Sequence, residues 1–127
     1  MPYSSINCPN PLDVSIDLSP YQKFSYALNA PESQRQYPRR FQQFLDHLKI
    51  SESSIEDNIN TLYKLIEKNG SKWLEPELLK FFRLQNQRAE RNEISTETIR
   101  NYLKPIKLFC QMNGVLINWN LITKDWL

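Results

Sequence analysis

The feature of this sequence that most constrains its fold is the spacing of apolar residues between Ser95 and Cys110. Apolar side chains recur there every three or four residues, which places them on one face of a helix: Ile99, Tyr102, Leu103, Ile106, Phe109 and Cys110. Ser95 or Thr96 can cap this helix by accepting a backbone N–H of its first turn. Its other positions are polar or cationic: Arg100, Asn101, Lys104, Lys107 and Gln111. Such a helix must bury its apolar face against other elements.

Three more segments show the same helical period. The spacing predicts a long helix from about residue 33, where Ser33 and Gln36 match a capping box. A second should run over residues 54–69 and end at Gly70, and a third should begin around Glu75-Pro76-Glu77. Ser19 and Pro20 also suit the start of a short helix that stops before residue 31.

The composition agrees with a helical protein. The chain has 127 residues and only two glycines, and much of it is compatible with long helices. We therefore expect an all-α fold, a compact bundle of four main helices with a short extra N-terminal helix and a C-terminal tail. Trp119, Ile122 and Trp126 in that tail should either pack back onto the bundle or await a missing partner. Residues 1–18, rich in Pro, Ser, Asn and Asp, are interpreted as a flexible arm.

The charges are nearly balanced in number but uneven in distribution. Sixteen cations and fourteen anions leave a net charge of +2. The first, third and fourth long helices carry cationic flanks, whereas the outer face of the second is acidic. A one-sided nucleic-acid footprint requires such segregation, although an ordinary solvated helix face explains any single flank equally well.

Residue types needed for catalysis are scarce. His47 is the only histidine, and neither Cys8 nor Cys110 has a partner at metal-ligand spacing. Carboxylate pairs near expected helix ends, such as Glu75 with Glu77, are explained by compensation of the helix dipole. We therefore predict no catalytic residues, no metal and no cofactor. The absence of an apolar run of about 20 residues argues against a membrane span, and the cysteine usage favours an intracellular, cytoplasmic location.

Taken together, two segments carry a resemblance to a known family. Their patterns are Ser33…Tyr37…Phe41…Phe44-Leu45…Leu48 and Ser95-x-x-Thr98-Ile99-x-x-Tyr102-Leu103…Ile106…Phe109. This arrangement, with two helices between, resembles the N-terminal core-binding domain of tyrosine recombinases, the phage-integrase family. The amino-acid sequences of residues 30–38 and 107–119 most resemble those of archaeal integrase-like proteins. Pro38 and Pro105 depart from the family pattern, and we expect bends there.

The resemblance implies a SAM-like bundle over residues 19–122 that forms half of a clamp around double-stranded DNA. Residues 123–127 would then begin a linker to a catalytic domain of the same polypeptide, which is absent from this chain. The parent protein would be a tyrosine recombinase, which breaks and rejoins DNA strands during integration or recombination. Family members act as tetramers on DNA, and we expect this chain alone to be a monomer.

The resemblance also implies which side chains face DNA. Asn101 is the candidate for reading a base, because an amide can bond adenine in two places, and Thr98 and Arg100 would hold phosphates. The full set of candidates is Ser33, Arg35, Gln36, Arg39, Gln43, Thr96, Thr98, Arg100, Asn101 and Lys104. Weaker candidates lie on the third long helix: Lys80, Arg83, Arg88 and Arg91.

Two other functions remain open at this point. The chain could be a helical protein-interaction module that uses exposed aromatic anchors: Tyr21, Phe24, Trp119 and Trp126. It could also be a stand-alone small DNA-binding regulator, such as an excision factor.

Overall fold

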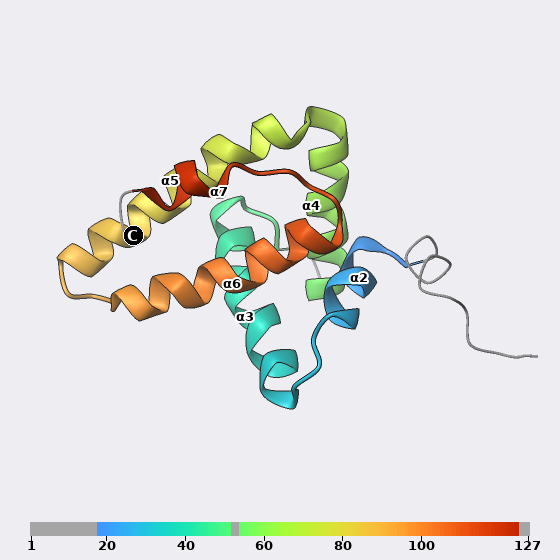
Figure 1. Ribbon diagram of the computed structural model, residues 1–127, viewed down its shortest axis with the longest axis horizontal. Coiled ribbons are helices and arrows are strands. Elements are labelled where there is room, and N and C mark those ends of the chain that lie inside the picture. Colours follow the sequence, from blue (N-terminus) through green and yellow to red (C-terminus); the bar gives the residue numbers. More distant parts are fainter. Residues whose placement is uncertain (1–17, 52–53, 125–127) are drawn as a thin grey trace, which may run out of the picture.

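The structure is a computed structural model that describes residues 18–51 and 54–124. These residues form six helices and no strand, which confirms the all-α expectation. The helices, in chain order, are α2 (Pro20–Tyr26), α3 (Pro31–His47), α4 (Ile55–Asn69), α5 (Ser71–Glu90), α6 (Thr96–Met112) and α7 (Trp119–Ile122). Figure 1 shows α5 and α6 as a hairpin, with α3 crossing α6 and α7 lying along α5.

Aromatic side chains fill the place where α3 crosses its neighbours. The Phe41 ring packs edge-on against Phe24 of α2 and Phe109 of α6, at centroid distances of 5.4 and 5.2 Å. Further along α3, Phe44 packs against Phe81 of α5 at 5.3 Å. The Phe24, Phe41, Phe44 and Phe109 side chains are fully buried. Edge-to-face packing has a preferred geometry, so these rings fix the relative placement of four helices in addition to excluding water.

Three of the helix starts that have a side-chain cap lie where the sequence predicts them. Ser19 and Gln22 form a complete capping box at the start of α2. Ser54 Oγ accepts the N–H of Asp57 at 3.1 Å to cap α4, and Ser95 caps α6 in the same way. Each such bond satisfies one of the four backbone donors that a helix start leaves free.

The predicted start of α3 at Ser33 is wrong. The helix begins two residues earlier at Pro31, with Ala30 as an N-cap that makes no side-chain bond. Proline suits the first helical position because its fixed φ is helical and its missing N–H would have no helical partner. The Gln36 amide donates instead to Glu32 at 2.8 Å, so the proposed capping box does not form.

The predicted start of α5 near Glu75 is also wrong. Gly70 ends α4 and also precedes the first residue of α5, so the two helices share one junction residue. Its φ of 86° lies in the left-handed region that glycine adopts readily, and the chain turns there from one helix into the next without a linker. Pro76 consequently lies inside α5. Glu75 is past the first turn, and its carboxylate accepts the Asn118 N–H at 2.9 Å instead of compensating the dipole.

The described part of the tail packs against the helices as predicted. Ile122 is buried and Trp119 packs partly buried against the core. Trp126 and the proposed arm, apart from residue 18, lie outside the described residues. Pro38 and Pro105 lie inside α3 and α6, and each helix continues past its proline.

One helix end adopts a conformation that its residue disfavours. Lys49 follows α3 with φ 63°, and the next N–H, that of Ile50, bonds back to the Leu45 carbonyl at 2.8 Å. This closure usually places glycine in the left-handed position.

We expect Lys49→Gly to raise the free energy of unfolding by about 0.5–1 kcal/mol, because removing Cβ strain outweighs the added chain entropy. Urea denaturation measures this change. Lys64→Gly, at an exposed position inside α4, should instead destabilise the protein by about 0.5–1 kcal/mol.

The ring of Phe41 should contribute more to stability than any exposed apolar side chain. Phe41→Ala removes a fully buried ring from between two others, so the free energy of unfolding should fall by about 3–5 kcal/mol. Thermal and urea denaturation followed by circular dichroism measure the loss. Leu84→Ala, at a side chain 45% exposed, should change stability by less than about 1 kcal/mol. Equal losses in the two variants would contradict this account of the core.

Candidate nucleic-acid interface

The helix α6 presents one apolar face inward and one cationic face outward. Ile99, Ile106, Phe109 and Cys110 are buried, as their spacing predicts. Burial alone raises the pKa of the Cys110 thiol to about 12, so this cysteine acts as a small apolar side chain. The outward positions hold the polar candidates, and α3 packs across the inward face.

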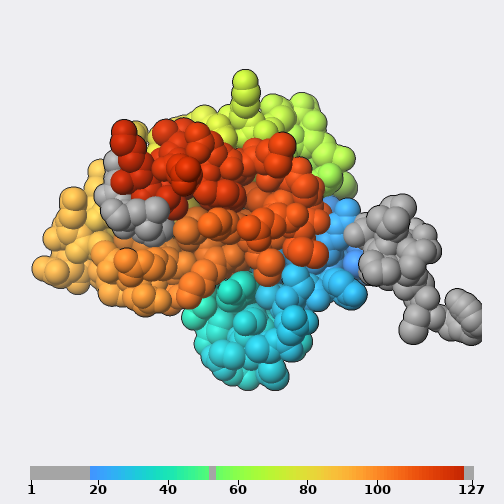
Figure 2. Space-filling model, viewed as in Figure 1, coloured from blue at the N-terminus to red at the C-terminus, as the bar shows by residue number. Residues whose placement is uncertain are grey.

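A cleft opens where the first turns of α3 approach the outer face of α6. Its volume is about 350 Å³, and we call it the α3–α6 cleft. Its lining residues come from the α2–α3 connection and both helices: Ala27, Leu28, Asn29, Ser33, Tyr37, Lys104, Lys107, Leu108 and Gln111. No acidic residue lines it. Figure 2 shows the cyan start of α3 projecting beyond the orange surface of α6, with the blue α2–α3 connection beside it.

The predicted site residues on α6 are differently engaged. Thr96 is exposed, whereas the half-buried Thr98 shares a hydrogen bond of 3.1 Å with the Ser95 hydroxyl. Arg100 pairs with Glu97 at 3.5 Å. Asn101 Oδ1 accepts a hydrogen bond from Lys104 Nζ at 3.4 Å, so the predicted base-reading amide lies beside a cation on the same helix.

The predicted residues on α3 surround a carboxylate. Arg35 forms an ion pair with Glu32, and Gln36 donates a hydrogen bond to the same carboxylate. The hydrogen bond from Gln36 and then the charge of Arg35 hold the pKa of Glu32 below its ordinary value. Arg39 and Gln43 are exposed and make no hydrogen bond or ion pair within residues 18–51 and 54–124.

Among the described residues, two of the ten predicted residues line the α3–α6 cleft. Ser33 and Lys104 both line the α3–α6 cleft, and the other eight do not. Helical spacing places Arg39 in the same row as Gln42, whose amide oxygen accepts a bond of 3.0 Å from Asn58 of α4. Arg39 itself is exposed and does not line the cleft.

Sequence reasoning missed part of this cleft. Lys107 and Gln111 were recognised as outward-facing but were not chosen as site residues, and Tyr37 was assigned only to the buried stripe. Lys107 and Gln111 lie three and seven residues after Lys104, and Tyr37 lies four residues after Ser33. These helical spacings place them on the same faces as Lys104 and Ser33 and could have identified them. Asn29 lies in a connection, where no periodicity could identify it.

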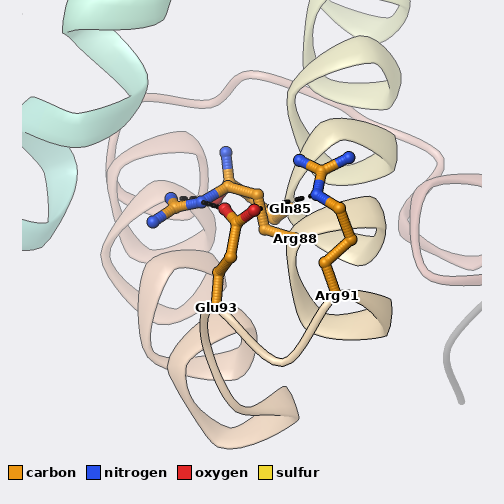
Figure 3. A network of polar contacts seen from close by, with 4 residues as sticks. All are labelled: Gln85, Arg88, Arg91 and Glu93. Carbon is orange, nitrogen blue, oxygen red and sulfur yellow. Dashed lines mark hydrogen bonds and ion pairs between the residues drawn. The ribbon is translucent and has the colours of Figure 1, made fainter.

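A separate group of cations on α5 is tied to the α5–α6 connection. Glu93 accepts from Arg91 Nε at 2.8 Å and from Arg88 Nε at 3.4 Å. Arg88 also donates to the buried Gln85 amide oxygen at 3.0 Å, and Figure 3 shows both guanidinium groups turned toward the same carboxylate. Lys80 pairs with Glu77 at 3.4 Å, so three of the four weaker candidates have local acidic partners.

No protein-family model, curated protein sequence or solved structure matches this chain. Within the described ranges, no helix is both long enough and apolar enough to cross a membrane. The same part of the chain contains no group of three potential metal-ligating side chains.

The contacts of Glu93 with Arg88 and Arg91 should make the stability of the protein depend on pH. Hydrogen bonding from Arg91 is the largest cause that lowers the pKa of Glu93, so folding favours the ionised carboxylate. Its contribution to stability should be complete above the ordinary carboxyl pKa and should disappear as the pH falls through the lowered value. We expect Glu93→Gln to lower the urea midpoint at pH 7, and we expect this difference from the parent protein to be smaller near pH 3. An equal difference in urea midpoint at both pH values would contradict a stabilising contribution from the ionised Glu93 carboxylate.

Proposed function

We propose that this chain is the DNA-binding, core-binding domain of a site-specific tyrosine recombinase. In this proposal α3, α4, α5 and α6 are the four main helices of the SAM-like bundle. The first and last of them face duplex DNA, and a catalytic domain of the same polypeptide would close the clamp. The observation that carries the proposal is the α3–α6 cleft, because two lysines and no acid line it.

The distribution of charge around this cleft supports a polyanionic partner. Lys104 and Lys107 are joined on α6 by Arg100, one turn before Lys104 on the outer face. Arg39 does not line the cleft, but it is a further exposed cation on α3 and has no acidic partner in the described residues. Phosphate neutralisation by such side chains provides affinity without sequence specificity, and base contacts such as one from Asn101 would add specificity.

If the chain is a protein-interaction module, its contact residues are not the ones that the sequence suggested. Phe24 is fully buried, and Tyr21 and Trp119 pack partly buried against the core, so these three are not free anchors. Leu116 and Tyr26 are the largely exposed apolar side chains, at 84% and 66%. Single exposed apolar side chains are ordinary on a protein surface, and they mark a contact surface only where they gather in patches. A small DNA-binding regulator remains a variant of the first proposal.

A salt titration of duplex binding tests the proposed function. We expect affinity, measured by fluorescence anisotropy on a labelled duplex, to fall steeply between low and moderate salt as counterion release predicts. Lys104→Glu should weaken binding by about tenfold, since it removes one phosphate contact and adds a repulsive charge, and Arg39→Glu should also weaken it.

Lys64→Glu is the matched control, because Lys64 is exposed on the acidic helix α4 and should leave binding nearly unchanged. Affinity that does not respond to salt would contradict the proposal. Full binding by both Lys104→Glu and Arg39→Glu would favour the protein-interaction module.

A further inference from the structure

We propose that the α3–α6 cleft seats one phosphodiester group of bound duplex DNA, with Lys107 as a contact residue beside Lys104. This inference rests on the proposed function and deepens it. It adds a specific phosphate position and residues that neither the family resemblance nor the predicted site contained.

The first argument is the charge left without a partner. Lys104 and Lys107 are three residues apart on one helix face, where like charges repel each other. Lys104 bonds only the neutral Asn101 oxygen, and Lys107 makes no hydrogen bond or ion pair in the described ranges. Of the 14 other cations, five pair with nearby carboxylates: Arg35, Lys80, Arg88, Arg91 and Arg100. An anion in the cleft would relieve the repulsion between the two lysines.

The second argument is the chemistry of the other walls. Ser33 provides a hydroxyl donor, and Asn29 and Gln111 provide amide donors. Phosphate oxygens accept such bonds, and the lysine ammonium groups add charge-assisted ones. The ring of Tyr37 and the side chain of Leu108 supply apolar surface against which the carbon atoms of a deoxyribose can pack. A cleft of about 350 Å³ has room for a phosphate together with one attached sugar.

The third argument concerns the source of the phosphate. Sites for free small ligands enclose most of the ligand surface, whereas this cleft lies beside a projecting edge of the molecule (Figure 2). The cationic row continues along α6 from the cleft to Arg100, about two turns before Lys107. An extended phosphate backbone can follow such a row, and a free nucleotide cannot.

The experiment combines a salt titration with a phosphate titration. Duplex affinity is measured over a salt series for the parent chain, Lys107→Gln, Lys107→Arg and the control Lys64→Gln. We expect Lys107→Gln to weaken binding about three- to tenfold and to reduce the slope of log affinity against log salt by about 0.9. Lys107→Arg should restore the slope, and Lys64→Gln should not change it. Thermal midpoints of all variants report whether they fold.

The second measurement follows backbone amide chemical shifts as inorganic phosphate is added. We expect weak, saturable shifts around Asn29, Ser33 and Gln111 in the parent chain and their loss in Lys107→Gln. Salt-dependent duplex binding with an unchanged slope in folded Lys107→Gln would overturn this inference but leave the proposed function standing.

Two other outcomes separate the claims further. If the parent chain does not bind duplex DNA but phosphate still shifts the cleft amides, the proposed function and the duplex source both fail, and the cleft is a site for free phosphate. If neither ligand binds, both proposals are overturned.

Discussion

The contact of the Phe41 ring with Phe24 and Phe109 determines how the remaining structure can be arranged. Three helices meet at these rings, and α3 crosses α6 where they pack edge to face. Because α3 crosses α6 instead of running alongside it, the first turns of α3 project past the outer face of α6 (Figures 1 and 2). The α3–α6 cleft is the corner that this projection creates, so the polar surface depends on the apolar packing beneath it.

The sequence was most informative where a local side chain fixes a helix end. Ser19, Ser54 and Ser95 each bond a backbone N–H within three residues, so a short pattern contains the whole interaction. The sequence was misleading where backbone geometry, and not a capping side chain, sets the start of a helix. Pro31 begins α3 without a cap, and Gly70 joins two helices directly, so the more obvious polar patterns downstream gave starts that were too late.

The candidate site shows a similar division. Helical spacing predicted which face of α6 points outward, because burial of Ile99 and Phe109 determines it locally. Spacing could not predict which flank of α3 meets that face, since this depends on the crossing. Ser33 and Arg39 were grouped as DNA-facing on the resemblance alone. Only Ser33 reaches the cleft, whereas Arg39 is exposed and does not line it.

The ion pairs indicate how far an anionic surface could extend from the cleft. Exposed pairs such as Arg100 with Glu97 contribute little, about 0–1 kcal/mol, so a phosphate can replace the carboxylate at small cost. The arginines around Glu93 share one carboxylate, and Arg88 is also bonded to the buried Gln85, so releasing them disrupts several contacts together. The cations available to a polyanion therefore run from the cleft along α6 to Arg100 and end before the α5–α6 connection. This extent follows from which carboxylates lie nearby, and the net charge of +2 alone could not have revealed it.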